Sequence, residues 1–187
     1  MKKLIFALLL VSVVSVCSVF AQPVRTTKTI VQTSGPAPAS AVNGSMAPDF
    51  NVTSMEGKVF DSKALRGKVI VLNLWFVNCP FCVQEIALLN PIVDQYKDKE
   101  VVFIGLSINS KPQLESFLKT RPFKYNVIPG AGQLMLFKFG EVGKGGNVDL
   151  KFPLHVVIDR EGKQVLKMQG IQGVDAVRQE LEKQFKK

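Results

Sequence analysis

The chain is poor in the residues that bind metals and cross-link secreted folds. Its 187 residues include three cysteines and a single histidine, His155. A structural zinc site takes four ligands, usually two cysteine pairs or a pair with added histidines, so this composition argues against zinc. Covalent haem attachment needs a histidine directly after a Cys-x-x-Cys pair, and Val83 occupies that position. We therefore expect neither a metal nor a bound cofactor.

The positive charge of the chain lacks the clustering that nucleic-acid sites show. The formal net charge is +9, and loss of Lys2 and Lys3 with an N-terminal segment leaves +7. The other lysines and arginines are scattered, and no basic cluster carries interleaved aromatic residues. This pattern favours a soluble basic surface over nucleic-acid binding.

The first 21 residues have the order of a signal peptide. Two lysines at positions 2 and 3 precede an apolar run over residues 4–14, and a small-residue site ends at Ala21. This order predicts cleavage after Ala21 and places the protein in the periplasm or on the outer face of the cell membrane. Three alternatives stay open: an uncleaved membrane anchor, a lipoprotein attached through Cys17, and a cytosolic protein with an apolar first helix.

The exported chain divides into a linker and one domain. Residues 22–46 are rich in Thr, Ser, Pro, Ala and Gly, without sustained hydrophobic periodicity, and this predicts a flexible linker. Residues 47–187 are long enough for one domain with a hydrophobic core.

Within that domain, strand and helix patterns alternate. A nearly continuous apolar run, an amphipathic helix and a second apolar run predict two parallel strands joined by a helix. Residues 133–139 fit either helix or strand, and the glycine-rich residues 140–147 predict a loop. The expected strands lie at 50–52, 58–60, 68–76, 101–108, 125–128, 154–159 and 164–168, and the expected helices at 80–96, 111–120 and 174–185. These elements predict an α/β fold, with a central mixed sheet flanked by helices and an N-terminal β-hairpin.

Two cysteines stand where the first long strand ends and its helix begins. We expect Cys79 to cap the helix and Pro80 to occupy its first position, where a missing N–H costs nothing. The free N–H groups and the helix dipole then favour a thiolate on Cys79, which makes it the nucleophile. Cys82 lies one turn further along and is placed to resolve a mixed disulfide formed at Cys79. A bridge across so short a loop adds little stability, so redox chemistry explains the pair better than a structural staple; an inert buried pair is the alternative.

Three motifs extend this observation beyond the cysteines. Residues 47–50 read Ala-Pro-Asp-Phe, residues 67–75 lead into the cysteine pair, and residues 152–159 precede Glu-Gly-Lys at 161–163. With these motifs the chain resembles the thioredoxin superfamily, and within it the TlpA/ResA-like exported thiol-disulfide oxidoreductases related to AhpC/TSA proteins. The resemblance covers residues 47 to the C-terminus and implies a thioredoxin-like fold.

The resemblance also implies an acid near the dithiol. Glu85, three residues after Cys82, takes the position of an acid that helps to move the proton of the second thiol. Thioredoxins proper have a buried acid in the preceding strand, where this chain has Asn73, as its branch does. The alternative is a glutamate that merely favours a helix start. We expect His155 to be a strand histidine with its hydrogen bonds satisfied, with a role near the site as the alternative.

The same resemblance implies a partner-binding surface. Pro153 takes the position of the cis-proline that faces the dithiol in the family, with an ordinary trans proline as the alternative. Phe152 and Phe81 are expected to add apolar surface for partner binding. Trp75 is expected either to pack beside the dithiol as part of this substrate-binding group or to fill the core.

The implied activity is reduction of disulfides in exported proteins through Cys79 and Cys82, for cytochrome c maturation or thiol repair. Apocytochrome c is one candidate partner, and a membrane thiol reductase is the expected electron donor. Asn78 replaces a tryptophan that the branch often has, and this change, with the Pro80-Phe81 dipeptide, leaves the direction of electron flow open. One alternative is a peroxiredoxin-like peroxidase, although Phe76 replaces the threonine of that family. The other is a non-catalytic thioredoxin-like binding module.

Overall fold

The computed structural model of the protein describes residues 44–186. The expected signal peptide and nearly all of the expected linker lie outside the described residues. At the start of the described part, Ser45 O accepts a hydrogen bond from Gln164 N at 2.9 Å. Met46 pairs with Lys163 in an antiparallel bridge. Across residues 44–186, no helix has the length and apolar character needed to cross a membrane.

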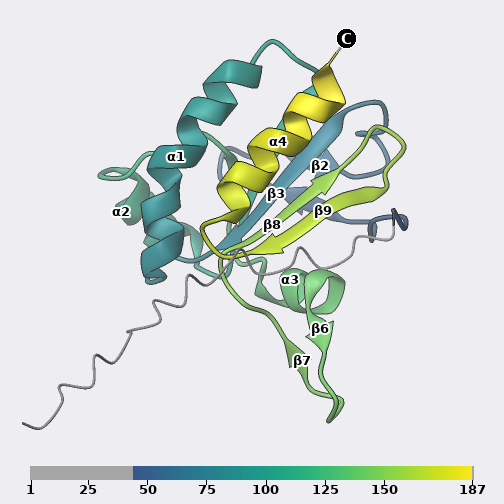
Figure 1. Cartoon of the computed structure of the whole chain (residues 1–187). Helices are drawn as coiled ribbons and strands as arrows, with labels where there is room; N and C mark the ends of the chain where they lie inside the picture. The colour runs from purple at the N-terminus through teal and green to yellow at the C-terminus, as the bar shows by residue number, and fades with distance from the viewer. Residues whose placement is uncertain (1–43, 187) are drawn as a thin grey trace, which may run out of the picture. The chain divides into compact units, whose positions relative to one another are not determined.

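A five-stranded mixed sheet forms the centre of the domain (Figure 1). The strand order is β5-β4-β3-β8-β9. Strands β3, β4 and β5 run parallel, whereas β8 is antiparallel to both of its neighbours, β3 and β9. The strands are β3 (Val69–Trp75), β4 (Val101–Ser107), β5 (Asn126–Ile128), β8 (Leu154–Ile158) and β9 (Gln164–Gln169). The predicted mixed sheet and its parallel β3–α1–β4 unit are confirmed.

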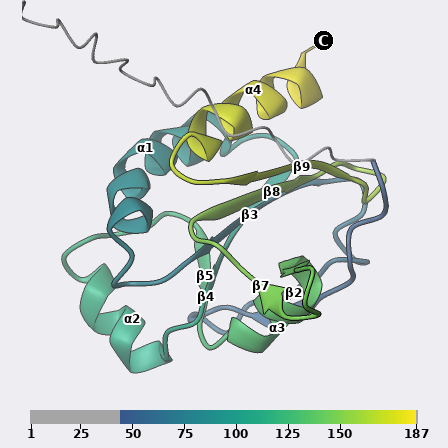
Figure 2. The same ribbon diagram turned by 60° about the horizontal axis from the view of Figure 1, so that its bottom comes forward.

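Helices cover both faces of this sheet because its central strands are apolar on both sides. In β3, Val71 and Trp75 belong to one buried cluster, and Leu72 belongs to the other. The helices are α1 (Pro80–Tyr96), α2 (Lys111–Leu118), α3 (Gly132–Phe139) and α4 (Gly173–Phe185). Figure 2 shows α1 and α4 on one face and α3 on the opposite face. The first cluster joins α1, α2 and α4 to the sheet, and the second joins α3 and the N-terminal hairpin.

Two short hairpins flank the sheet. The N-terminal hairpin pairs β1 (Asn51–Thr53) with β2 (Val59–Asp61), as predicted. The second hairpin corrects the expected loop over residues 140–147: β6 (Glu141–Val142) pairs antiparallel with β7 (Val148–Asp149). Its strands have two residues each, too few to show an alternating pattern between the glycines. The ambiguous residues 133–139 are helical and belong to α3.

Candidate active site

The two cysteines form a disulfide at the N-terminus of α1. Cys79 is the N-cap residue, Pro80 is the first helical residue, and Cys82 N donates a hydrogen bond to Cys79 Sγ at 3.2 Å. This is the predicted capping arrangement, in which a helix N–H points at the sulfur of the first cysteine. The loop before Cys79 is held by Val77 N, which donates to Asn109 Oδ1 at 2.9 Å.

The two sulfur-bearing residues differ in exposure. Cys79 is 5% exposed and Cys82 is 1% exposed. A groove of about 750 Å³ opens beside Cys79, between the start of α1 and α2. It is lined by Val77, Asn78, Cys79, Pro80, Val83, Gln113, Ser116, Phe117, Thr120 and Arg121. A partner can therefore approach Cys79 from this groove, whereas Cys82 lies behind it.

The residues predicted to bind a partner fall into two groups. The Phe152–Pro153 peptide bond is cis, as the family resemblance implies. The Phe152 ring packs edge-on against Phe76, in the loop that leads to Cys79, with 5.2 Å between ring centroids. Phe81, on the first turn of α1, is 60% exposed. These three residues thus lie on or beside the elements that present the dithiol.

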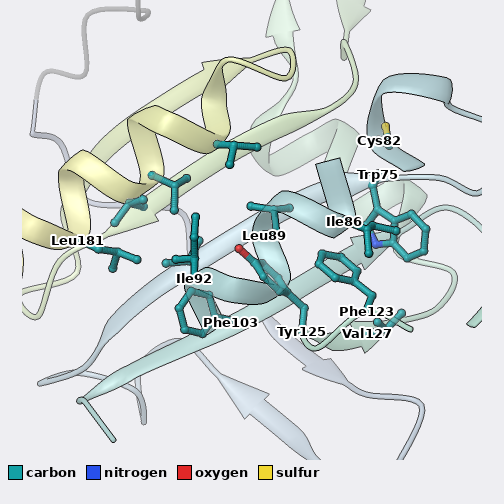
Figure 3. Packing of buried hydrophobic residues seen from close by; sticks show 14 of the residues in the cluster. Trp75, Cys82, Ile86, Leu89, Ile92, Phe103, Phe123, Tyr125, Val127 and Leu181 are labelled. Carbon is teal, nitrogen blue, oxygen red and sulfur yellow. The ribbon is translucent and has the colours of Figure 1, made fainter. Parts of the chain in front are cut away.

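Trp75 belongs to the second group, because the structure places it in the core. Its side chain is fully buried. The indole packs against Phe117 and Phe123, each at a centroid distance of 5.5 Å. Trp75 and Cys82 belong to the same buried cluster (Figure 3). Of the two roles expected for Trp75, the structure supports the one in which the indole fills the core. No indole surface is left for a partner.

Beneath the dithiol lies a buried polar cluster of Glu85, Asn73 and His155. Asn73 Nδ2 donates to Glu85 Oε1 at 2.7 Å, and His155 Nε2 lies 3.1 Å from Glu85 Oε2. Asn73 Nδ2 also lies 3.5 Å from His155 Nδ1. All three side chains are at most 1% exposed. Glu85 therefore has a partner for each carboxylate oxygen, as a buried carboxyl group requires.

The sheet register explains why these residues meet. Asn73 of β3 and His155 of β8 are direct antiparallel partners. Their neighbours Val71 and Val157 belong to the cluster beneath α1 and α4, so both polar side chains face α1. The sequence prediction placed Glu85 near the dithiol but did not join it to Asn73 or His155. The available signal was a single polar residue inside each of two otherwise apolar strands.

Tyr125 is a further buried polar group near Glu85. Its ring packs between those of Phe103 and Phe123 (Figure 3). Within the described residues its hydroxyl has no hydrogen-bond partner. Burial, and secondarily the Glu85 carboxylate, raise the pKa of the Tyr125 phenol above its ordinary value of 10.0. The phenol is therefore neutral in the folded protein throughout the physiological range.

A Tyr125→Phe variant should change how stability depends on alkaline pH. The raised folded-state pKa means that the buried neutral phenol contributes its full stability to the wild type below pH 10. Above pH 10 the phenol ionises in the unfolded chain, and the wild type progressively loses that stability. The variant should therefore lose stability less steeply there, by up to about 1.4 kcal/mol per pH unit. At pH 7 its unfolding free energy should change by no more than about 1 kcal/mol. Urea unfolding of the variant and the wild type at pH 7 and above pH 10 measures this, and an unchanged alkaline slope for Tyr125→Phe contradicts it.

No metal-binding group accompanies the dithiol in the described part of the chain. Among residues 44–186, no three His, Cys, Asp or Glu side chains come together in a way that could hold a metal ion. The ionisable groups near the cysteines are the buried Glu85 and His155 and, in the groove beside Cys79, Arg121. The chemistry that the site offers is thiol-disulfide exchange with an internal carboxylate close to the second cysteine.

Comparisons with known proteins agree with this chemistry. A model of the AhpC/TSA family matches residues 43–165. The thiol-disulfide oxidoreductase ResA of Bacillus thuringiensis subsp. konkukian is 31% identical over 145 residues, which are 77% of this chain and 77% of the relative. The thioredoxin-like protein YneN of Bacillus subtilis is 25% identical over 125 residues, 64% of this chain and 66% of the relative.

Solved structures show the same fold. The thioredoxin domain of a thiol-disulfide oxidoreductase from Bacteroides vulgatus has a TM-score of 0.59 at 23% identity, covering 73% of this chain and 95% of that one. A thioredoxin-family thiol:disulfide interchange protein from Chlorobium tepidum has a TM-score of 0.59 at 23% identity, covering 78% and 98%. Together with the geometry of the dithiol, these findings show that the chain belongs to the AhpC/TSA family of the thioredoxin superfamily, as a TlpA/ResA-like thiol-disulfide oxidoreductase.

Proposed function

We propose that the protein reduces disulfides in exported partner proteins. The Cys79 thiolate attacks a partner disulfide and forms a mixed disulfide, releasing one partner thiol. Cys82 then gives its proton to Glu85 and attacks Cys79 Sγ, which releases the second partner thiol. The enzyme ends as the Cys79–Cys82 disulfide, and two electrons pass to the partner. The observation that carries this proposal is a fully buried carboxylate on the helix face of the buried cysteine.

The partner is expected to bind at the exposed side of the dithiol. Phe81 offers apolar surface on the first turn of α1, and Phe152 and Pro153 precede β8 beside the loop that holds Cys79. An extended partner segment placed between them would bring its disulfide to Cys79. Aromatic and apolar side chains of this kind are common contacts in protein recognition sites.

The N-terminal sequence supports a location outside the cytoplasm. Residues 1–21 have the order of a signal peptide, so we assign the enzyme to the periplasm or to the outer face of the membrane. Partners there would be apocytochrome c or exported proteins whose thiols need repair. A membrane thiol reductase would return the Cys79–Cys82 disulfide to the dithiol after each turnover.

The reduction potential of the Cys79–Cys82 pair tests the direction of electron flow. We expect equilibration with a glutathione or dithiothreitol buffer to give a midpoint near that of thioredoxin, about −270 mV. A midpoint of about −120 mV would instead identify an oxidase. Absence of any redox couple would favour a binding module. Rapid consumption of hydrogen peroxide at Cys79 would favour the peroxidase alternative.

A further inference from the structure

We propose that His155 is a positioning residue for thiol-disulfide exchange, which acts by holding the Glu85 carboxylate as a proton acceptor for Cys82. The inference deepens the proposed function and rests on the role given there to Glu85. It concerns the second half of the reaction, in which Cys82 resolves the mixed disulfide. Cys79 attacks the partner in the first half, before Cys82 has to lose its proton.

The hydrogen-bond directions within the cluster follow from the chemistry of the amide. Asn73 Nδ2 carries two hydrogens; one reaches Glu85 Oε1 at 2.7 Å and the other faces His155 Nδ1 at 3.5 Å. His155 Nδ1 then acts as an acceptor, which places the ring proton on Nε2. Nε2 is 3.1 Å from Glu85 Oε2 and donates to it. Each side chain of the triangle thus fixes the other two.

In this arrangement His155 donates a hydrogen bond to Glu85, and Glu85 is the group that accepts the proton of the Cys82 thiol. A carboxylate has about four lone-pair positions, and Asn73 and His155 occupy one on each oxygen. The remaining positions are free to accept the proton of Cys82. His155 Nδ1, by contrast, faces the Asn73 amide. Loss of the imidazole would leave a fully buried Oε2 atom without its partner, and the carboxylate would lose its fixed orientation.

The elements packed around Glu85 bring few titratable groups to it. His155 comes from β8, Asn73 from β3, and Tyr125 from the residue before β5, with a phenol that stays neutral. Helix α4 contributes Gly173, which has no side chain. Among the described residues, His155 is the one ionisable side chain that hydrogen-bonds to Glu85.

The protein also provides a space for the imidazole at the start of α4. A Cβ atom added at Gly173 would collide with Cδ2, Cγ and Nε2 of the His155 ring. Gly173 is buried, and its φ angle is not in the left-handed region, so backbone conformation does not explain the glycine. The close approach of the ring does explain it. Gly173 thus gives a second, independent way to displace the imidazole from Glu85.

The experiment separates the two halves of the reaction with a symmetric aromatic disulfide. The fully reduced protein is mixed with one equivalent of dithiodipyridine in a stopped-flow instrument. Attack by Cys79 releases the first thiopyridone, and attack by Cys82 on the mixed disulfide releases the second. The proteins are wild type, Glu85→Gln, His155→Leu, His155→Gln, Gly173→Ala and the double variant Glu85→Gln/His155→Leu. Val157→Ala, in the same strand and facing the same cluster, controls for lost packing.

We expect His155→Leu to slow the second release by about tenfold or more and to leave the first within about twofold. His155→Gln, whose amide keeps a donor, should restore most of the rate, and Gly173→Ala should resemble His155→Leu. The double variant should be no slower than Glu85→Gln, because both changes remove the same function. The deficit of His155→Leu should shrink as pH rises, since hydroxide then replaces the internal base.

Two results would overturn different claims. His155 has no positioning role if Glu85→Gln slows the second release while His155→Leu leaves it unchanged. The same conclusion follows if His155→Leu slows both releases equally, as expected for a packing defect such as Val157→Ala. If Glu85→Gln leaves the second release unchanged, the proposed role of Glu85 itself fails, and the role of His155 fails with it. Where His155→Leu does not fold, Gly173→Ala takes its place as the variant with a displaced imidazole. His155→Gln remains the variant that keeps a donor to Glu85.

Discussion

A Cys79→Ser variant is expected to lose disulfide reduction by at least about a thousandfold, down to the uncatalysed rate. The attacking species in thiol-disulfide exchange is a thiolate, and a serine hydroxyl keeps its proton at neutral pH. Cys82 does not substitute, because it is 1% exposed and lies behind Cys79 at the groove. Reduction of insulin with dithiothreitol as the electron source, followed by turbidity, measures the loss.

Matched serine variants make this result specific. Cys82→Ser retains the nucleophile but not the resolving thiol, so it should accumulate a mixed disulfide that a non-reducing gel detects. Cys17 precedes the expected cleavage site after Ala21, so the mature protein would carry only Cys79 and Cys82. Wild-type turnover in either the Cys79 or the Cys82 variant would falsify the assigned roles.

A Trp75→Ala variant is expected to lower the free energy of unfolding by about 3–5 kcal/mol. The indole is fully buried and packs against Phe117 of α2 and against Phe123, which lies between α2 and β5. The indole packs closely on β4, because a Cβ atom at Gly105 would lie only 3.2 Å from Trp75 Nε1. Glycine has no side chain that could fill the cavity left by Trp75→Ala. Urea unfolding followed by circular dichroism measures the change, since the variant lacks the chain's single tryptophan.

Trp75→Phe serves as the control for this loss. Phenylalanine keeps an aromatic ring at the site and removes Nε1, which has no hydrogen-bond partner within the described residues. We expect a smaller loss of about 1–2 kcal/mol, because the cavity is smaller and an unpaired N–H is removed. Equal losses for the two variants would contradict a packing role for the indole.

The elements that local sequence determines could be predicted. The apolar run of β3 shows that the strand is covered on both faces, and the order Cys79-Pro80 marks the start of α1. The hairpin turn at residues 160–163 indicates that β8 pairs with β9, whereas the pairing of β8 with β3 could not be derived from such patterns, because the two strands are far apart in the sequence. The two-residue strands β6 and β7 are too short for any periodic signal.

The candidate site follows the same division. Cys79 and Cys82 lie three residues apart and could be identified together, and Glu85 and Pro153 came from the family resemblance. The contact between Asn73 and His155 could not be predicted, because it spans 82 residues and depends on the β3–β8 register. A one-residue slip in that register would turn the imidazole to the opposite face of the sheet, away from Glu85.

The β6–β7 hairpin gives this fold a place where chain length can change. Its turn is closed by its own hydrogen bonds, from Gly143 N to Asn147 O at 2.8 Å and from Gly146 N to Gly143 O at 2.9 Å. Its two strands form a separate sheet, apart from the five-stranded one (Figure 1). Residues inserted between positions 143 and 147 would therefore leave every pairing of the central sheet unaltered. Because the hairpin ends just before the Phe152–Pro153 cis peptide, a longer turn would change the chain ahead of that segment without rebuilding the domain.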